Sequence, residues 1–131
     1  MTEMLYPNPD PTTIDRRRAL APDIDGAFRR FGEAVFKEGA LPRKTKQLIA
    51  VAVAHVTQCP YCIRGHTKLA AREGATAEEV MEAVWVAAEM RAGAAFAHSV
   101  LALDALASAS APSPRHRRDD RSDTNPTTKE T

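Results

Sequence analysis

The amino-acid sequence predicts an all-α fold, and three observations lead to this prediction. Apolar residues return at helical spacing in successive segments between about Pro22 and Ala107. Glycines, prolines and a capping-box motif separate these segments, as helix stop and start signals do. Downstream of His66 the chain shows no strand pattern. We therefore expect a helical domain of about five to six helices over residues 21–108.

Length and composition narrow the class of protein. With 131 residues the chain is a single domain whose core is thin unless a partner subunit completes it. Its 18 basic and 17 acidic residues give a net charge of +1, which argues against nucleic acid or a membrane surface as a partner. The stretch Ala92–Ala111 is mainly alanine with polar interruptions, which favours a packed helix over a membrane span. The first residues carry no secretory pattern, so we expect a cytoplasmic protein.

The N-terminal part of the sequence predicts an arm followed by a helix. Three prolines among polar residues indicate an extended N-terminal arm over residues 1–20, without a core of its own. A first helix is expected from about Pro22, a residue suited to the first helical position, to Glu38. Its apolar residues form a single stripe that we expect to be core: Ile24, Phe28, Phe31 and Val35.

Two further helices surround the pair of cysteines. A second helix is expected over roughly Arg43–Thr57, and its centre is apolar on nearly every side, as in a helix buried all round. A third helix begins near Cys59 or Pro60 and ends at Glu73. Gly74 follows it as a C-terminal stop.

The remaining chain predicts two helices and a tail. Thr76–Glu79 reads as a capping box that opens a fourth helix. The inward face of that helix is expected to consist of Val80, Met81, Val84, Trp85 and Ala88. Around Arg91–Gly93 we expect a kink or break before a fifth helix that reaches about Ala107. Residues 109–131 lack periodicity and are expected to form a disordered tail.

The chemistry-bearing residues are Cys59, Cys62 and His66. The chain has two cysteines, three residues apart, which in a reducing compartment are more often catalytic or metal-binding than structural. At a helix start, unpaired backbone N–H groups and the helix dipole favour the thiolate of the first cysteine. His66 follows Cys62 by four residues, so the two share a helix face. A histidine there can take the thiol proton and later return it to a leaving group.

The stretch Lys44–His66 resembles the signature of the carboxymuconolactone decarboxylase superfamily. Within that superfamily, the cysteine pair points to the alkylhydroperoxidase AhpD-like branch. The resemblance covers about Phe28 to Leu106, and Ala88–Ala94 and the later His98 also look like that branch.

This resemblance implies an all-helical fold, a ring-like homotrimer or homohexamer, and thiol-dependent peroxidase or disulfide-reductase chemistry. In the mechanism we expect, the Cys62 thiolate, prepared by His66, attacks a small peroxide or a disulfide. Cys59 then resolves the intermediate, and an external dithiol reductant reduces the pair. No organic cofactor and no metal are implied. The family places a glutamate where this chain has Gln47, which keeps the hydrogen-bonding shape but cannot exchange a proton at physiological pH.

Other interpretations of the cysteine pair remain open at this point. Cys-Pro-Tyr-Cys is also the active-site tetrapeptide of glutaredoxins, but that fold needs further strands. A zinc site would use Cys59, Cys62 and His66, with His55 as a fourth ligand inside an apolar helix. A buried pair of purely structural cysteines is a further alternative.

Two functional alternatives keep the helical fold. One is a cofactor-free lyase of the carboxymuconolactone decarboxylase type, with His66 as the acid–base and the cysteines incidental. The other is a non-catalytic oligomeric binding protein. Of the other histidines, His55 is expected to be a satisfied core residue, and His98 is a candidate site residue only through the resemblance. Tyr61 is expected to shape access to the sulfurs.

Overall fold

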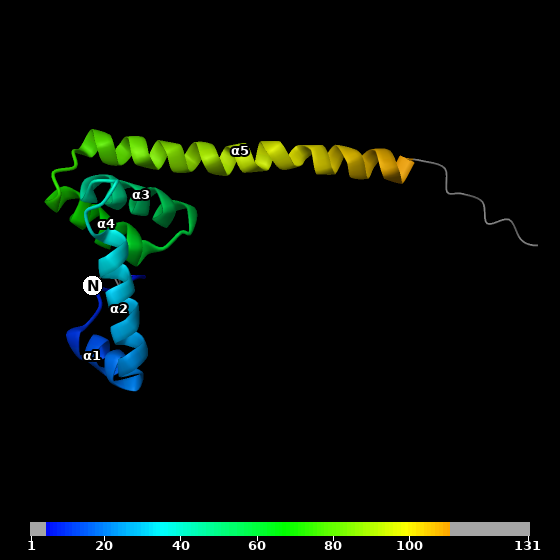
Figure 1. Ribbon diagram of the computed structural model, residues 1–131. Helices are drawn as coiled ribbons and strands as arrows, with labels where there is room; N and C mark the ends of the chain where they lie inside the picture. Colours follow the sequence, from blue (N-terminus) through cyan, green and yellow to red (C-terminus); the bar gives the residue numbers. More distant parts are fainter. Residues whose placement is uncertain (1–4, 111–131) are drawn as a thin grey trace, which may run out of the picture. The chain divides into compact units, whose positions relative to one another are not determined.

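The computed structural model describes residues 5–110, and its described residues form helices joined by short turns. The chain divides into two compact units, one up to Ala97 and one from His98. The helices, in chain order, are α1 (Pro11–Leu20), α2 (Pro22–Phe36), α3 (Arg43–Val56), α4 (Pro60–Arg72) and α5 (Ala77–Ser110) (Figure 1). The predicted all-α class is confirmed. Most of the predicted tail, from residue 111 onward, lies outside the described residues.

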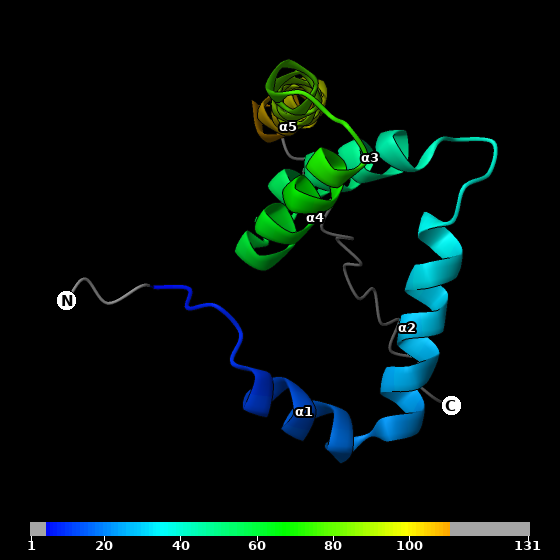
Figure 2. The ribbon, with the colours of Figure 1, turned by 90° about the vertical axis from the view of Figure 1, so that its left-hand side faces the viewer.

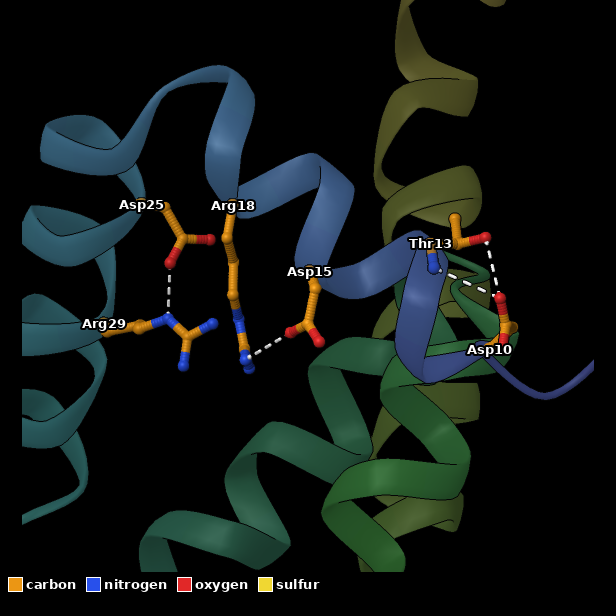
Figure 3. Close-up of polar contacts among 6 residues, drawn as sticks. All are labelled: Asp10, Thr13, Asp15, Arg18, Asp25 and Arg29. Atoms are coloured by element: carbon orange, nitrogen blue, oxygen red, sulfur yellow. Dashed lines mark hydrogen bonds and ion pairs between the residues drawn. The ribbon is translucent and has the colours of Figure 1, made fainter.

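The first helix corrects the prediction of an extended arm over residues 1–20. Residues 11–20 form α1, because Asp10 caps its N-terminus by accepting the Thr13 backbone N–H at 3.2 Å and Pro11 occupies the first turn (Figure 3). Ion pairs within one turn, Arg18 with Asp15 and Arg29 with Asp25, support α1 and α2. Helix α1 buries no side chain, so the expectation that this segment lacks its own core holds.

Helix α2 begins at Pro22, as predicted, but its apolar stripe is not core in the single chain. Phe28 is 73% exposed, and Ile24, Phe31 and Val35 are exposed as well. Within the described part of the chain, no element covers this stripe, so the expectation that it forms core is wrong there. Lys46 caps the C-terminal end of α2, because its ammonium donates to the carbonyl oxygens of Val35 and Lys37 at 2.8 and 2.7 Å.

The core of the described chain lies where α3 and α4 pack against each other, side by side in Figure 2. Helix α3 contributes Val51, which is fully buried, together with Ala54, and helix α4 contributes Ala70. The prediction that α3 is buried all round is wrong, because Ile49, Val53 and Val56 on its other side are exposed. Cys59, at the N-cap of α4, and Cys62 and His66, within α4, are therefore carried by one of the two helices of this core.

Helix α5 begins as predicted and then continues further than predicted. Thr76 and Glu79 form the capping box, with the Glu79 N–H donating to Thr76 Oγ1 at 3.2 Å and the Thr76 N–H donating to Glu79 Oε2 at 2.9 Å. The expected break at Arg91–Gly93 is absent, and one helix runs from Ala77 to Ser110. A single helical glycine costs only about 1 kcal/mol, and the neighbouring alanines favour the helix.

The expected inward face of α5 is also mostly exposed in the single chain. Trp85 is 68% exposed and Met81 is exposed, whereas Ala87 is the residue that α5 buries. By length and composition α5 could cross a membrane, a test that core helices of soluble proteins also pass. Two polar contacts tie its first part to α3: Lys44 Nζ lies 2.7 Å from Glu79 Oε1, and Arg91 Nη1 donates to the Val56 carbonyl at 3.2 Å.

Candidate functional site

The turn that ends α3 places Cys59 at the start of α4. The Cys59 N–H donates to the Ala54 carbonyl at 3.1 Å, and Gln58 just before it has a φ of 55°. This is the Schellman arrangement, in which a left-handed residue reverses the chain and closes the last turn. The same arrangement ends α4, where Gly74, with a φ of 85°, occupies the left-handed position as predicted. A non-glycine residue in this left-handed conformation costs about 1 kcal/mol of conformational free energy. The tight link between α3 and α4 therefore requires a locally unfavourable backbone conformation at Gln58.

The two cysteines are joined in a disulfide across the first turn of α4. Cys59 is the N-cap residue of α4, Pro60 fills the first turn, and the Cα atoms of Cys59 and Cys62 lie 5.3 Å apart. The Cys62 backbone N–H points at Cys59 Sγ at 3.2 Å, in the position that a capping oxygen normally occupies. Both cysteines are half-buried, so reagents can reach them. After reduction, this N–H and the helix dipole would stabilise a thiolate at Cys59.

His66 is held by Gln47, the position at which this chain departs from the family pattern. Gln47 is buried, with 6% of its surface exposed, and His66 Nδ1 donates to its Oε1 at 2.8 Å. The contact joins α3 to α4 across the core. With the amide oxygen as acceptor, Nδ1 carries the proton and Nε2 keeps its lone pair. His66 is thereby prepared to accept a proton at Nε2.

Phe36 is a contact of the site that the sequence did not reveal. Its ring stacks on the His66 imidazole, with centroids 5.1 Å apart and planes 29° from parallel. Sequence periodicity could only assign the phenylalanines to a core, because the stacking depends on where the C-terminal end of α2 meets α4. Phe36 and Gln47 together fix the orientation of the His66 ring.

Arg64 is a second contact that sequence reasoning missed. Its guanidinium lies 5.5 Å from the centroid of the Tyr61 ring and donates to the Tyr6 carbonyl at 2.7 Å and to Asn8 Oδ1 at 3.1 Å. Tyr6 also meets Tyr61 edge to face at 6.3 Å. The N-terminal segment is thus tied to Tyr61, one of the two residues between the cysteines. No local sequence signal predicts a contact between segments so distant along the chain.

The remaining predicted residues lie elsewhere. His55 Nδ1 donates to the Val51 carbonyl at 2.7 Å, so the predicted hydrogen-bonded histidine is confirmed, although its side chain is half-buried rather than part of the core. His98 is exposed on α5, at the start of the second compact unit, and its role stays a prediction. In the residues that the structure describes, no group of three His, Cys, Asp or Glu side chains is gathered to hold a metal ion. The sulfurs are paired with each other, which in this form removes them as thiolate ligands.

The fold and the site together define a helical protein with a disulfide-bonded Cys-x-x-Cys pair at a helix start and a histidine one turn later. The carboxymuconolactone decarboxylase family model matches residues 22–105. The chain belongs to this family, and its cysteine pair and His66 are consistent with the alkylhydroperoxidase AhpD-like branch.

The chain is also similar to a curated relative and to two solved structures, one of which is a carboxymuconolactone decarboxylase family protein. The chain is 58% identical over 106 residues to "Uncharacterized protein 4 in cox locus" of Paracoccus denitrificans, covering 81% of this chain and 95% of that protein. The crystal structure of an apo carboxymuconolactone decarboxylase family protein from Legionella pneumophila superposes with a TM-score of 0.58 at 38% identity, covering 60% of this chain and 70% of that one. A crystal structure of a protein from Methanobacterium thermoautotrophicum gives a TM-score of 0.61 at 37% identity, covering 63% and 93% of the two chains.

Proposed function

We propose that this protein is a thiol-dependent oxidoreductase that reduces a small peroxide or a disulfide by cycling the Cys59–Cys62 pair. The observation that carries the proposal is the disulfide across the first turn of α4, one turn before a histidine that Gln47 orients. The Cys62 N–H and the helix dipole act on the Cys59 sulfur, and the base His66 lies one helical turn after Cys62. This arrangement suits a cysteine pair that is reversibly oxidised and reduced.

With a peroxide, the Cys62 thiolate attacks one peroxide oxygen. A sulfur–oxygen bond forms, the oxygen–oxygen bond breaks, and the departing alkoxide takes a proton from His66 to leave as an alcohol. Cys59 then attacks the Cys62 sulfenic acid, so that the disulfide forms and hydroxide leaves as water. One peroxide is reduced, and two thiols are oxidised.

With a disulfide substrate, the Cys62 thiolate displaces one thiol and forms a mixed disulfide. Cys59 attacks that mixed disulfide and releases the second thiol. In either case, an external dithiol reduces the Cys59–Cys62 bond, as a cytoplasmic reductant would. The Cys62 N–H eases this last step, because it stabilises Cys59 as the leaving thiolate.

The experiment that tests the proposal is a thiol titration of the reduced protein with and without peroxide or disulfide. We expect both thiols to disappear together with oxidant and to return with a dithiol. A variant with both cysteines replaced by serine should lose all turnover. The lyase alternative predicts the opposite, because a reaction that depends on His66 alone would survive this double replacement.

We also propose that the protein works as a homotrimer or a multiple of it, such as a homohexamer. The support is the large apolar surface of one subunit, on which Phe28, Trp85 and Phe96 are 73%, 68% and 82% exposed. Exposed apolar area of this kind is typical of surfaces that pack against other subunits.

A further inference from the structure

A cavity of about 550 Å³ opens beside the redox motif, and it is built almost entirely from the N-terminal segment. Apart from Tyr61, every residue that lines it precedes Pro22, where the family match begins. Its lining residues are Pro7, Asn8, Pro9, Asp10, Thr13, Ile14, Arg17 and Tyr61. Apart from Tyr61, which is one of the two residues between the cysteines, the cavity is therefore lined by residues outside the family match.

The segment that forms this cavity is tied to α4. Arg64 holds the Tyr6 carbonyl and the Asn8 side chain, and Tyr6 meets the Tyr61 ring. A smaller cavity of about 210 Å³ lies along the same junction, lined in part by Asn8, Tyr61 and Arg64. These contacts are made from α4 itself, so the cavity wall is positioned by the helix that carries Cys62.

The cavity lining is mainly apolar, and it includes one charged side chain that has no partner among the described residues. Two prolines, Ile14 and the Tyr61 ring supply apolar surface. Asp10 is engaged as the cap of α1, where hydrogen bonds from Thr12 and Thr13 hold the pKa of its carboxyl below the ordinary value. Figure 3 shows the contact between Asp10 and Thr13. Arg17, by contrast, forms no hydrogen bond or ion pair with any residue in the range 5–110. Its guanidinium is available to an anion.

We propose that this cavity is the substrate-recognition site of the thiol pair, and that it selects organic disulfides or hydroperoxides with an aromatic-sized apolar body and a carboxylate. The apolar walls and the Tyr61 ring receive the body, and Arg17 pairs with the carboxylate. This inference rests on the proposed function, because it concerns which substrates reach Cys62. Arg17 and Ile14 are then specificity residues of α1, outside the family domain.

Two aromatic disulfides test the proposal, dithiobis(nitrobenzoate), which carries carboxylates, and dithiodipyridine, which is neutral. With either probe, the Cys62 thiolate displaces one aryl thiol, Cys59 displaces the other, and the protein disulfide forms. For the reduced full-length protein we expect Arg17→Gln to slow oxidation by the carboxylate probe by about three- to tenfold and to leave the neutral probe unchanged. Arg16→Gln is the matched control, since it removes the same charge from the neighbouring residue, which does not line the cavity.

A binding measurement separates this inference from the proposed function. Nitrobenzoate, which cannot undergo exchange, should bind the oxidised wild-type protein and the Arg16→Gln variant in ligand-detected NMR, and Arg17→Gln should lose this binding. Equal slowing by both arginine variants, or nitrobenzoate binding that Arg17→Gln leaves intact, would overturn the recognition site. If nitrobenzoate binds as expected but neither disulfide oxidises the pair, the cavity stands and the proposed redox function fails.

Discussion

Helices α3 and α4 differ from α2 and α5 in how their apolar residues are used. The first two bury theirs against each other within one chain, with Val51 fully enclosed and Gln47 joined to His66 across the contact. The other two leave large side chains in solvent, among them Phe28 and Trp85. The groups for the proposed chemistry thus lie on an intramolecular core, whereas the exposed apolar faces of α2 and α5 are those that the proposed assembly would cover.

This contrast predicts that one part of the sequence serves the chemistry and another part serves assembly. Substitutions in the α3–α4 pair should change chemistry and leave assembly intact. Substitutions on the outer faces of α2 and α5 should change assembly and leave the thiol pair able to close. The predictions below test this separation, beginning with the largest expected effect.

Replacing Cys62 by serine should lower turnover of peroxide and disulfide by about a thousandfold or more, because the nucleophile is lost. Helix content by circular dichroism and particle mass by light scattering should stay as in the wild type. A Cys62→Ser protein that retains a substantial fraction of its turnover would contradict the site.

Gln47→Glu should raise peroxide turnover about tenfold or more and leave disulfide exchange nearly unchanged. Peroxide cleavage needs a proton for the departing oxygen, which a carboxylate beside His66 can help to supply, whereas disulfide exchange depends mainly on the thiolates. Steady-state assays with both substrates measure this difference. The variant should be stable only while His66 is present, because an unpaired buried carboxylate costs several kcal/mol.

The control for this substitution is Gln47→Ala, which removes the acceptor for His66 without adding a carboxylate. It should slow both reactions. If Gln47→Glu folds normally and peroxide turnover does not rise, proton supply at this position does not limit turnover, and a dithiol–disulfide role is favoured.

Phe28→Glu on α2 should lower the particle mass about threefold or more, since a charge on a shared apolar face prevents assembly. Light scattering at micromolar concentration gives the mass, and Arg30→Glu on the same helix provides a charge control. A wild-type protein that is a stable monomer at that concentration would contradict the proposed assembly.

Phe36→Leu should slow oxidation of the pair by about two- to tenfold, because the ring that stacks on His66 no longer fixes its orientation. Phe36→Tyr should restore the wild-type rate, and the pH profile of the rate should broaden only in the leucine variant. Phe31→Leu, a matched change on α2, should leave rate and profile unaltered. A merely structural Phe36 would lower stability without changing the pH profile.

Glu79→Gln should have the smallest effect, a slight fall in Tm at neutral pH. The hydrogen bond from Lys44, with that from the Thr76 N–H, keeps the pKa of the Glu79 carboxyl below its ordinary value. A lowered folded pKa stabilises the fold above the unfolded value of about 4.3, and this contribution disappears as the pH falls through the folded pKa. Thermal melts at neutral and acidic pH should therefore differ between the two proteins only at the higher pH.

Local signals in the sequence were sufficient for much of the fold. Pro22, Gly74 and the capping box at Thr76 correctly marked helix ends, because each acts on its own few residues. The helix at residues 11–20 does not follow from the three prolines, which favour an extended arm, whereas Asp10 and Pro11 together start a helix. Gly93 does not break α5, because the alanines around it favour the helix.

For the site, spacing predicted the cysteine pair at the start of α4 and His66 one turn later. The position of Gln47 came from family resemblance, and its contact with His66 is a tertiary fact that spacing cannot supply. The contacts of Phe36 and Arg64 depend on how distant segments meet, so the sequence gives no local signal for them. Burial was predicted least well, because an apolar stripe indicates a contact without saying whether the partner is in the same chain.

The most direct test of the central claim, that Cys59 and Cys62 form a working redox pair, is the intact mass of the protein through one cycle. The account predicts a loss of two hydrogens when the reduced protein meets one equivalent of oxidant, and their return when a dithiol is added. The serine variants should show no such change. A stable zinc adduct with protected thiols, or a mass that oxidant and dithiol leave unchanged, would contradict the claim.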